Sequence, residues 1–427
     1  MKDIIEDLFK IYMACVDGYN SKFHQVVNDK YTVVDKSMIT VYLFLMIMED
    51  RDENNSEITD TLVNYLLKPV IFSETGNLAI EITDSSKAEM YYKILNKLIL
   101  EKFEYKNRII KYLKYMYKDN TFNQYNELLD FLENIAEICM LKKLSARGNT
   151  EVYPYIEQRK NELNNILKDL NENDNFYDEK TNLVKLIITN EFENSQYGNL
   201  VNIALNLKDI YRYSSITITT PENVLFHQYV TTVMLLNLVE YSNNVLKEEF
   251  DIYTALKKSL MHDFSEYKGN EIVTQFKNYN DITKKMFAEI EEADERDLEK
   301  KIGSKLYYII LNEKKGPEGY IMEIVDKILG IMRLWVDAGY LGNNNVVRAT
   351  NSVYQDRFKR FLRVENIEQI KNKEFYINLL REYYIYIKEH LIENNIEYTL
   401  KYFTKEEVEE FRKEIKLLRT NPESFLK

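Results

Sequence analysis

Apolar residues recur every three or four positions along most of the chain, which is the spacing of one face of an α-helix. The repeat is clear in five segments: "LVNYLLKPVI", "YKILNKLILEKF", "ELLDFLENIAEICMLKKL", "VTTVMLLNLVEY" and "IVDKILGIMRLWV". Only 11 Gly and 5 Pro interrupt the 427 residues, and these two residue types disfavour helices most strongly. The pattern therefore predicts an all-α protein.

The clearest break in the helical pattern is "KDLNENDNFYDEKTN", residues 168–182, which is polar and rich in Asn and Asp. We interpret it as a linker, because such clusters mark loops between periodic segments. The chain is long enough for two or three domains. We expect one helical domain over residues 1–167 and a second over residues 183–360. A helical C-terminal extension over residues 361–427 would pack across the second domain or form an interface.

The two halves resemble each other weakly in three places that occur in the same order. Residues 222–240 align without gaps with residues 30–48, which sets His227 opposite Asp35. At the same offset "HDFSEYKGN" lies opposite "VIFSETGN", and further on "DKILGIMRLWVDAGYLGNNN" lies opposite "DFLENIAEICMLKKLSARGNT". The shared order favours a duplicated domain. Two unrelated helical bundles of similar composition are the alternative.

Charge and cysteine content narrow the classes of partner. The net charge is −12 and no basic stripe is present, so binding of duplex nucleic acid is not expected, although a small phosphorylated ligand remains possible. Cys15 and Cys139 are too far apart for a zinc motif and are typical of a reduced, cytoplasmic protein. Acidic residues interrupt the N-terminal apolar run, and no stretch of the chain predicts a membrane span.

Four residues of the second half could hold a metal ion: His227, His262, Asp263 and Asp326. Imidazoles and carboxylates suit a divalent transition metal. His227 follows the helix-start pattern "PENV", and His262 and Asp263 close the predicted helix "IYTALKKSLMHD". Asp326 interrupts an apolar helix, where a lone buried carboxylate would be costly. Each residue alone has an ordinary structural explanation, but the ordered set on three helices favours a metal site.

The order His, His-Asp, Asp resembles the HD superfamily of metal-dependent phosphohydrolases. Within that superfamily the second half resembles the bacterial 5′-deoxynucleotidases, which remove phosphate from deoxynucleoside monophosphates. The likeness covers about residues 205–360 and is carried by "RYSSITITTPENVLFH", "LMHDFSE" and "VDKILGIMRLWVDAGYLGNN". The fold it implies is an HD-type helical domain.

The resemblance also implies roles for individual residues. The expected ligands of one divalent ion (Mn, Co, Mg, Zn or Fe) are His227, His262, Asp263 and Asp326. Glu266 would position or deprotonate the attacking water. Arg212 would bind the substrate phosphate, because a guanidinium can bind phosphate in a bidentate manner. Tyr213 occupies the place of an aromatic residue that packs near the sugar.

Two positions depart from the family pattern. The family has Gly-Asp after the His-Asp-x-x-Glu motif, whereas this chain has Gly269 and Asn270, one residue closer. Asn270 is therefore expected near the substrate, but it cannot supply the acidic group that the family has there. Glu271 could supply that group instead. Phe226 stands before the first His, where the family usually has an acidic residue. Both departures leave the exact substrate open.

The first half lacks the expected ligands. The positions opposite His262 and Asp263 are Val70 and Ile71, and only Asp130, opposite Asp326, is acidic in addition to Asp35. We therefore expect a metal-free, degenerate HD-like domain. Such a domain could pair with the second one inside a monomer, as an internal pseudo-dimer, or the chain could form a homodimer.

The leading hypothesis is a cytoplasmic, metal-dependent phosphohydrolase that releases phosphate from nucleotides, foremost (deoxy)nucleoside 5′-monophosphates. One alternative keeps the fold but changes the substrate to a triphosphate or a signalling nucleotide. The other is a non-catalytic regulator that binds nucleotide without turnover.

Overall fold

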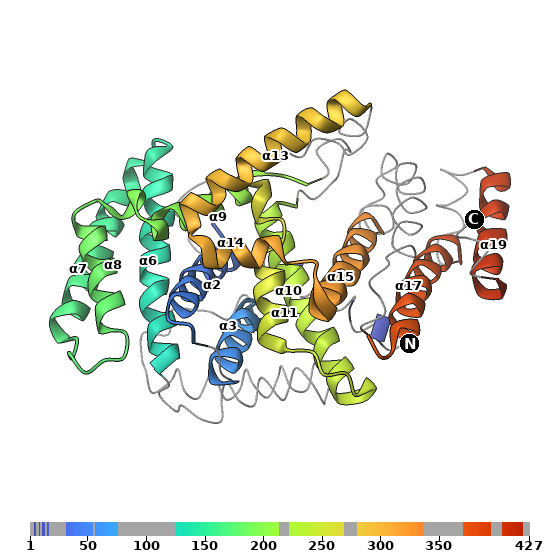
Figure 1. The fold of residues 1–427 in the computed structure, drawn as a ribbon, viewed down its shortest axis with the longest axis horizontal. Coiled ribbons are helices and arrows are strands. Elements are labelled where there is room, and N and C mark those ends of the chain that lie inside the picture. The colour runs from blue at the N-terminus through green and yellow to red at the C-terminus, as the bar shows by residue number, and fades with distance from the viewer. Residues whose placement is uncertain are drawn as a thin grey trace.

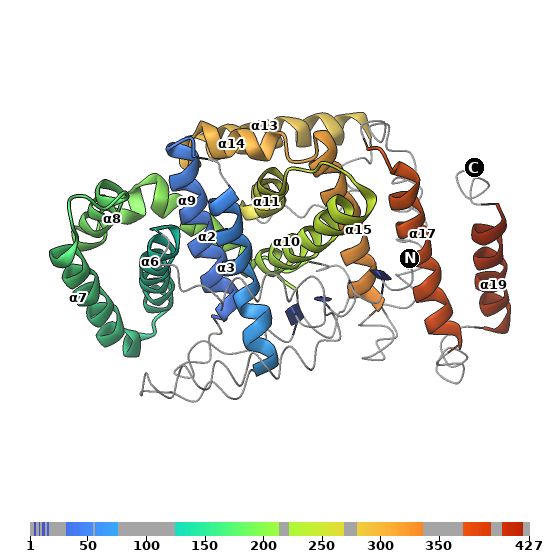
Figure 2. The same cartoon turned by 90° about the horizontal axis from the view of Figure 1, so that it is seen from below.

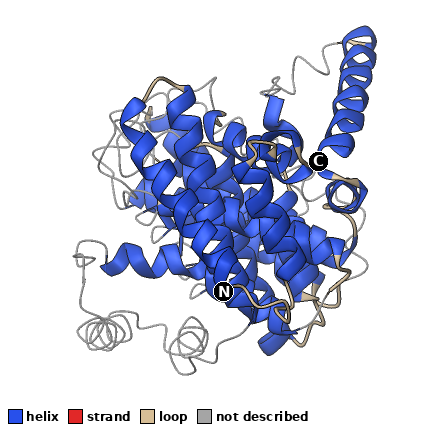
Figure 3. Ribbon diagram, turned by 90° about the vertical axis from the view of Figure 1, so that its left-hand side faces the viewer, coloured by secondary structure: helices blue, strands red, loops and turns tan. Residues whose placement is uncertain are grey.

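The regular structure of the described residues is helical in the computed structural model (Figure 3). The structure describes residues 31–53, 56–75, 124–212, 222–268, 280–335, 370–393 and 404–421, together with isolated positions between residues 4 and 16. Within these ranges extended pairing is limited to an isolated antiparallel bridge between Tyr211 and Asn223. The prediction of an all-α protein is confirmed. None of the helices in the described ranges combines the length and apolar character needed to cross a membrane.

The helices follow one another through both halves of the chain. The first half contributes α2 (Val33–Asp50), α3 (Ser56–Thr75), α6 (Gln124–Ala146), α7 (Tyr153–Asp169) and α8 (Tyr177–Ile188). The second half contributes α9 (Gln196–Asp209), α10 (Val224–Tyr241), α11 (Ile252–Met261), α13 (Asp281–Ile302), α14 (Ser304–Leu311) and α15 (Gly316–Trp335). The C-terminal extension contributes α17 (Lys373–Glu393) and α19 (Lys405–Thr420).

Helices α2 and α10 lie at the centre of the molecule (Figures 1 and 2). Both are buried along almost their whole length, as expected for helices that are apolar on every face. Helix α2 contacts α3 and α6 of its own half and also α9, α10 and α14 of the other, while α10 packs against α11 and α15. The buried apolar side chains of the two halves form one continuous core.

The segment expected to be a linker, residues 168–182, is helical at its two ends and not in between. It contains the end of α7, a short turn and the start of α8, and the two helices pack against each other. Asp174 holds the turn, because its carboxylate accepts a hydrogen bond from the Phe176 amide (2.7 Å) and another from Lys180 Nζ (2.7 Å). The polar composition therefore marks a helix–turn–helix. The domain boundaries remain a prediction.

The paired positions of the two halves have different surroundings. Asp35 lies in the first turn of α2, as His227 does in α10, but Asp35 is fully buried, accepts a hydrogen bond from the Thr32 amide and pairs with Lys208 of α9. Helix α3 continues to Thr75, whereas α11 ends at Met261. Asp130 of α6 is exposed. The side chains of residues 70, 71 and 74 lie outside the described residues, and the duplication remains a prediction.

The C-terminal extension packs onto the second half. Helix α17 contacts α15, and α19 contacts α17 on its outer side (Figure 1). Asn372, just before α17, donates two hydrogen bonds to the Glu248 carboxylate, one from its backbone N–H and one from its side-chain Nδ2, both at 2.8 Å. Of the two arrangements expected for this extension, the structure shows packing across the second half.

Candidate metal centre

The chain brings Arg212 and His227 together by pairing the end of α9 with the start of α10. The Arg212 amide donates to the Glu222 carbonyl (2.8 Å) and the Val224 amide donates to the Ile210 carbonyl (3.0 Å). Asn223 caps α10, since its side chain accepts a hydrogen bond from the Phe226 amide (2.8 Å). Residue types that accept at this position are favoured as N-caps. His227 is thereby fixed in the first turn of α10.

His262 and Asp263 lie where α11 stops. His262 is the C-cap residue with extended backbone angles, and Asp263 follows in the left-handed region at φ 56°. Consecutive residues on a continuous helix point about 100° apart. Ending the helix at this point allows both side chains to face the same site. A short 3₁₀ turn, η4 (Phe264–Lys268), then carries Glu266.

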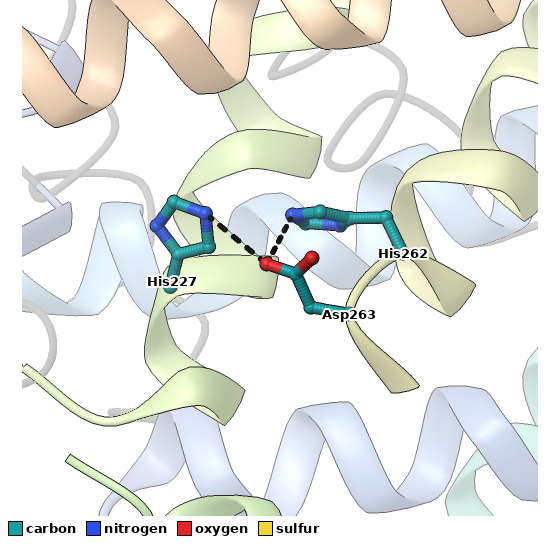
Figure 4. Close-up of side chains that lie close together, drawn as sticks. All are labelled: His227, His262 and Asp263. Carbon is teal, nitrogen blue, oxygen red and sulfur yellow. Dashed lines mark ion pairs between the residues drawn. The ribbon is translucent and has the colours of Figure 1, made fainter. Parts of the chain in front are cut away.

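The side chains of His227, His262 and Asp263 converge (Figure 4). One ligand atom from each lies within 4.8 Å of the others. Asp263 Oδ2 lies 3.8 Å from His227 Nε2 and 3.6 Å from His262 Nε2. The structure therefore places three of the four predicted ligands in one cluster.

The fourth predicted ligand, Asp326, joins this cluster through His227. Its Oδ1 lies 3.0 Å from His227 Nε2, and its Oδ2 lies 2.7 Å from Lys327 Nζ. Burial alone would raise the pKa of Asp326, but the charge of Lys327 and the contact with His227 lower it well below its usual range. Asp326 is therefore a carboxylate at neutral pH, as a metal ligand must be.

Hydrogen bonds to the other ring nitrogen define the tautomer of both histidines. His262 Nδ1 lies 2.5 Å from the Ser259 carbonyl oxygen, which can only accept, so Nδ1 carries the hydrogen. His227 Nδ1 lies 3.2 Å from the Glu222 carboxylate and must likewise donate when that group is ionised. In the neutral rings both Nε2 atoms are therefore lone-pair donors that face the cluster.

The pKa values of the two histidines shift in opposite directions. Burial and the charge of Arg212 lower the pKa of His227, but its hydrogen bonds to Asp326 and Glu222 raise the pKa above its usual value. Burial lowers the pKa of His262. Burial would raise the pKa of Asp263. His262 and Arg212 stabilise the carboxylate, and the pKa therefore lies well below its usual range.

Arg212 is a second cation of the site, in addition to Lys327. Its Nη1 lies 2.6 Å from Asp263 Oδ2 and its Nη2 lies 3.9 Å from Asp326 Oδ1. Its side chain is only 11% exposed, so it is held within the site and does not extend into solvent. The predicted phosphate-binding residue and two predicted metal ligands therefore share one cluster.

Three other predicted residues are less well placed by the structure. Glu266 is half-buried in η4, and its amide donates to the Asp263 carbonyl (3.0 Å). Tyr213 and Asn270 lie outside the described residues, as does Glu271. Their predicted roles remain predictions.

The structure also reveals a carboxylate behind His227 that sequence reasoning missed. Glu222 is buried, with Oε1 facing His227 Nδ1 and Oε2 3.3 Å from Arg333 Nε of α15. Burial opposes ionisation, but His227 and Arg333 hold the pKa of Glu222 below its usual value. Carboxylates that accept a hydrogen bond from a ligating His fix its orientation and increase its basicity. The acidic residue of "PENV" was the available signal.

A second missed carboxylate, Glu313, lies between α14 and α15. Burial raises its pKa to about 8; nearby Lys314 lowers it, and the charges of Asp263 and Asp326 raise it. Its side chain is 14% exposed. The charges of two predicted metal ligands therefore act on this carboxyl group. No motif in the sequence marks this residue.

The donor set fits a divalent transition metal. Two imidazole nitrogens and carboxylates of low pKa form the kind of mixed N/O set that such ions prefer. His262 Nε2 is buried and has no hydrogen-bond partner among the described residues, a costly state for a polar atom unless something binds to it. His227, His262, Asp263 and Asp326 could therefore hold the ion, with Glu222 supporting His227.

This geometry can be compared with known families. Residues 199–356 match the family of YfbR-like 5′-deoxynucleotidases. The match contains every predicted ligand and lies in the C-terminal half, so the predicted resemblance is confirmed there. The YfbR-like region is thus an HD-type domain, of a family whose members are hydrolases. Searches of curated proteins and of solved structures give no match.

Proposed function

We propose that the chain is a metal-dependent phosphohydrolase that releases phosphate from nucleoside 5′-monophosphates, with deoxyribose preferred over ribose. The convergence of His227, His262 and Asp263 within the YfbR-like region carries the proposal. Both histidines offer Nε2 to the same space, because their Nδ1 atoms are engaged by Glu222 and by the Ser259 carbonyl. Asp326 completes the set from α15.

A divalent ion at this position would lower the pKa of water from about 15.7 toward about 7 and so supply a nucleophile at neutral pH. The chain supplies the surrounding charges. Arg212 carries a guanidinium next to Asp263, and a guanidinium can donate two parallel hydrogen bonds to a phosphate group. It binds and orients the phosphate, which would otherwise be repelled by the carboxylates of the site.

Two carboxylic groups account for the protons. The water oxygen forms a bond to phosphorus while the bond from phosphorus to the 5′-oxygen breaks. Glu266, which follows the His-Asp pair in η4, accepts the proton of the water. The leaving 5′-oxygen takes up a proton, and Glu313, a largely buried residue of the loop before α15, is the proposed donor. Glu313 thereby supplies the acid that Asn270 lacks.

The preference for deoxyribose depends on Tyr213. An aromatic side chain packed at C2′ rejects a hydroxyl by crowding and by loss of its hydration, which is worth about 1–3 kcal/mol. Ribonucleotides would then react about 5- to 160-fold more slowly. A Tyr213→Ala variant should lose this discrimination while retaining phosphate release.

The test is phosphate release from a panel of ribo- and deoxyribonucleoside 5′-mono- and triphosphates, each with Mn²⁺, Co²⁺ or Mg²⁺. Release from monophosphates by the wild type, and none by an Asp263→Ala control, supports the proposal. Release from triphosphates alone overturns it in favour of another nucleotide substrate. Nucleotide binding without release, in the presence of every metal, overturns it in favour of a non-catalytic regulator.

A further inference from the structure

The peptide bond between His262 and Asp263 is held by a chain of hydrogen bonds that begins in the first half of the protein. Tyr42 of α2 donates its hydroxyl hydrogen to Gln228 Oε1 (2.9 Å), and Gln228 Nε2 donates to the His262 carbonyl oxygen. Tyr42 and Gln228 are 1% and 0% exposed. Tyr42 lies far outside the YfbR-like region.

The direction of this relay is fixed by its chemistry. Burial raises the pKa of Tyr42 well above its usual value, so the hydroxyl stays neutral and can donate at any ordinary pH. With Oε1 of Gln228 occupied by that hydroxyl, only its NH₂ group can face the His262 carbonyl, which accepts. Without the hydroxyl, only the bond to the His262 carbonyl would hold this orientation of the amide, and the Gln228 side chain would be less firmly fixed.

The bonded carbonyl belongs to the peptide that joins two predicted metal ligands. Asp263 has a positive φ, which costs a residue other than Gly roughly 1–2 kcal/mol and persists only where the surroundings enforce it. Because the His262 carbonyl lies beyond the end of α11, Gln228 supplies a bond that the helix does not. The orientation of this peptide determines where the Asp263 side chain points.

Tyr42 also contacts the residue that follows the pair. Its ring meets that of Phe264 edge to face, with the centroids 5.2 Å apart and the planes at 72°. Phe264 is fully buried and begins η4, the turn that carries Glu266. One side chain of the first half therefore contacts the His-Asp turn both through Gln228 and directly.

We infer that Tyr42, acting through Gln228, is a positioning residue that holds the His262–Asp263 turn in its metal-binding geometry. The inference rests on the proposed function, since it assigns to the first half a role in that site. The first half then contributes to metal binding without providing a ligand.

The experiment measures metal affinity directly on metal-stripped protein. Mn²⁺ binding is followed by titration calorimetry, and Co²⁺ binding by its visible absorption spectrum, which reports the coordination geometry. Tyr42→Phe removes one oxygen and keeps the ring against Phe264. Loss of a partner that orients a ligand typically costs about 10–100-fold in affinity, so we expect the Kd to rise by about ten-fold or more and the Co²⁺ spectrum to change. With saturating metal, kcat should fall while KM for the nucleotide stays unchanged, because Arg212 is untouched.

Tyr229→Phe is the matched control. Tyr229 of α10 is equally buried and donates its hydroxyl to the Leu66 carbonyl of α3 (2.9 Å), so this variant also removes one hydrogen bond between the halves. It should leave metal affinity unchanged. Gln228→Ala breaks the same relay at its other end and serves as a second variant if Tyr42→Phe does not fold. In the Gln228→Ala background, Tyr42→Phe should cause no further loss of affinity.

The outcomes separate the two claims. If the wild type binds neither ion, the proposed function fails and this inference fails with it. If the wild type binds metal and Tyr42→Phe binds it equally tightly, the inference alone is overturned. Equal losses in Tyr42→Phe and Tyr229→Phe would also overturn it, since they would reflect general loosening of the contact between the halves.

Discussion

Glu222→Gln is the sharpest perturbation of the candidate metal centre that leaves every predicted ligand in place. The carboxylate has one oxygen toward His227 Nδ1 at 3.2 Å and the other toward Arg333 Nε at 3.3 Å. Glutamine has almost the same shape but only one acceptor oxygen, and its NH₂ group can only donate. It therefore cannot serve both partners.

Each orientation of the new amide has its own cost. If the oxygen faces His227, the buried Arg333 loses this carboxylate, and loss of one partner of a buried ion pair typically costs about 3–5 kcal/mol of stability. If the NH₂ group faces His227, Nδ1 must accept and the hydrogen moves to Nε2, the atom that would bind the metal. Metal affinity then falls by about 10–100-fold, as for other residues that orient a ligating His.

The assay combines urea unfolding of the metal-free protein with calorimetric titration of Mn²⁺. Glu137→Gln is the control: Glu137 is similarly buried and pairs with Arg159 at 3.0 Å, but in α6 and α7. We expect the control to lose some stability and no metal affinity. If Glu222→Gln keeps both the unfolding midpoint and the Mn²⁺ affinity of the wild type, the assigned role of Glu222 is wrong.

Three further outcomes are expected. Asp263→Ala should bind no divalent ion by elemental analysis and release no phosphate, with an unchanged helical circular dichroism spectrum. The pKa of Glu313 is about 8 in the folded chain against an ordinary 4.5, so between pH 4.5 and pH 8 the folded state binds one proton more than the unfolded state. The unfolding free energy of the metal-free protein should therefore fall as the pH rises from 4.5 to 8, and urea unfolding should show a smaller fall in Glu313→Gln. Asp35→Ala should lower the unfolding free energy by about 3 kcal/mol, because it leaves Lys208 without its buried partner, while metal binding persists; loss of metal binding in this variant would show that Asp35 supports the site.

Much of the fold was predictable because helical periodicity is a local property. The uniformly apolar α10 and the apolar stripe of α15 appear directly in the sequence, and the few Gly and Pro residues leave helices as the main choice. The polar run at residues 168–182 contains the turn between α7 and α8, but short polar side chains favour tight turns and open linkers alike. Asp174, which closes the turn through two hydrogen bonds, distinguishes them only once the partners are known.

Only those residues of the candidate site that stand out by type and by order along the chain could be predicted from the sequence. His227, His262 and Asp263 converge as predicted, since histidine and aspartate on apolar helices stand out. Glu222 and Arg333 did not stand out, because nothing local pairs two charges so far apart in the chain. Gln228 and Tyr42 look like ordinary helix residues, and their roles depend on how α2 and α10 pack.

The end of α11 has a consequence for any attempt to build a second metal site in the first half. Helix α3 continues through residues 70 and 71 to Thr75, so a His and an Asp introduced there would point about 100° apart and could not chelate one ion as a pair. A helix stop and a residue tolerant of positive φ would have to be introduced as well. A site of this kind in the first half would therefore need a change of backbone before a change of side chains, so substitutions at residues 70 and 71 alone could not create it.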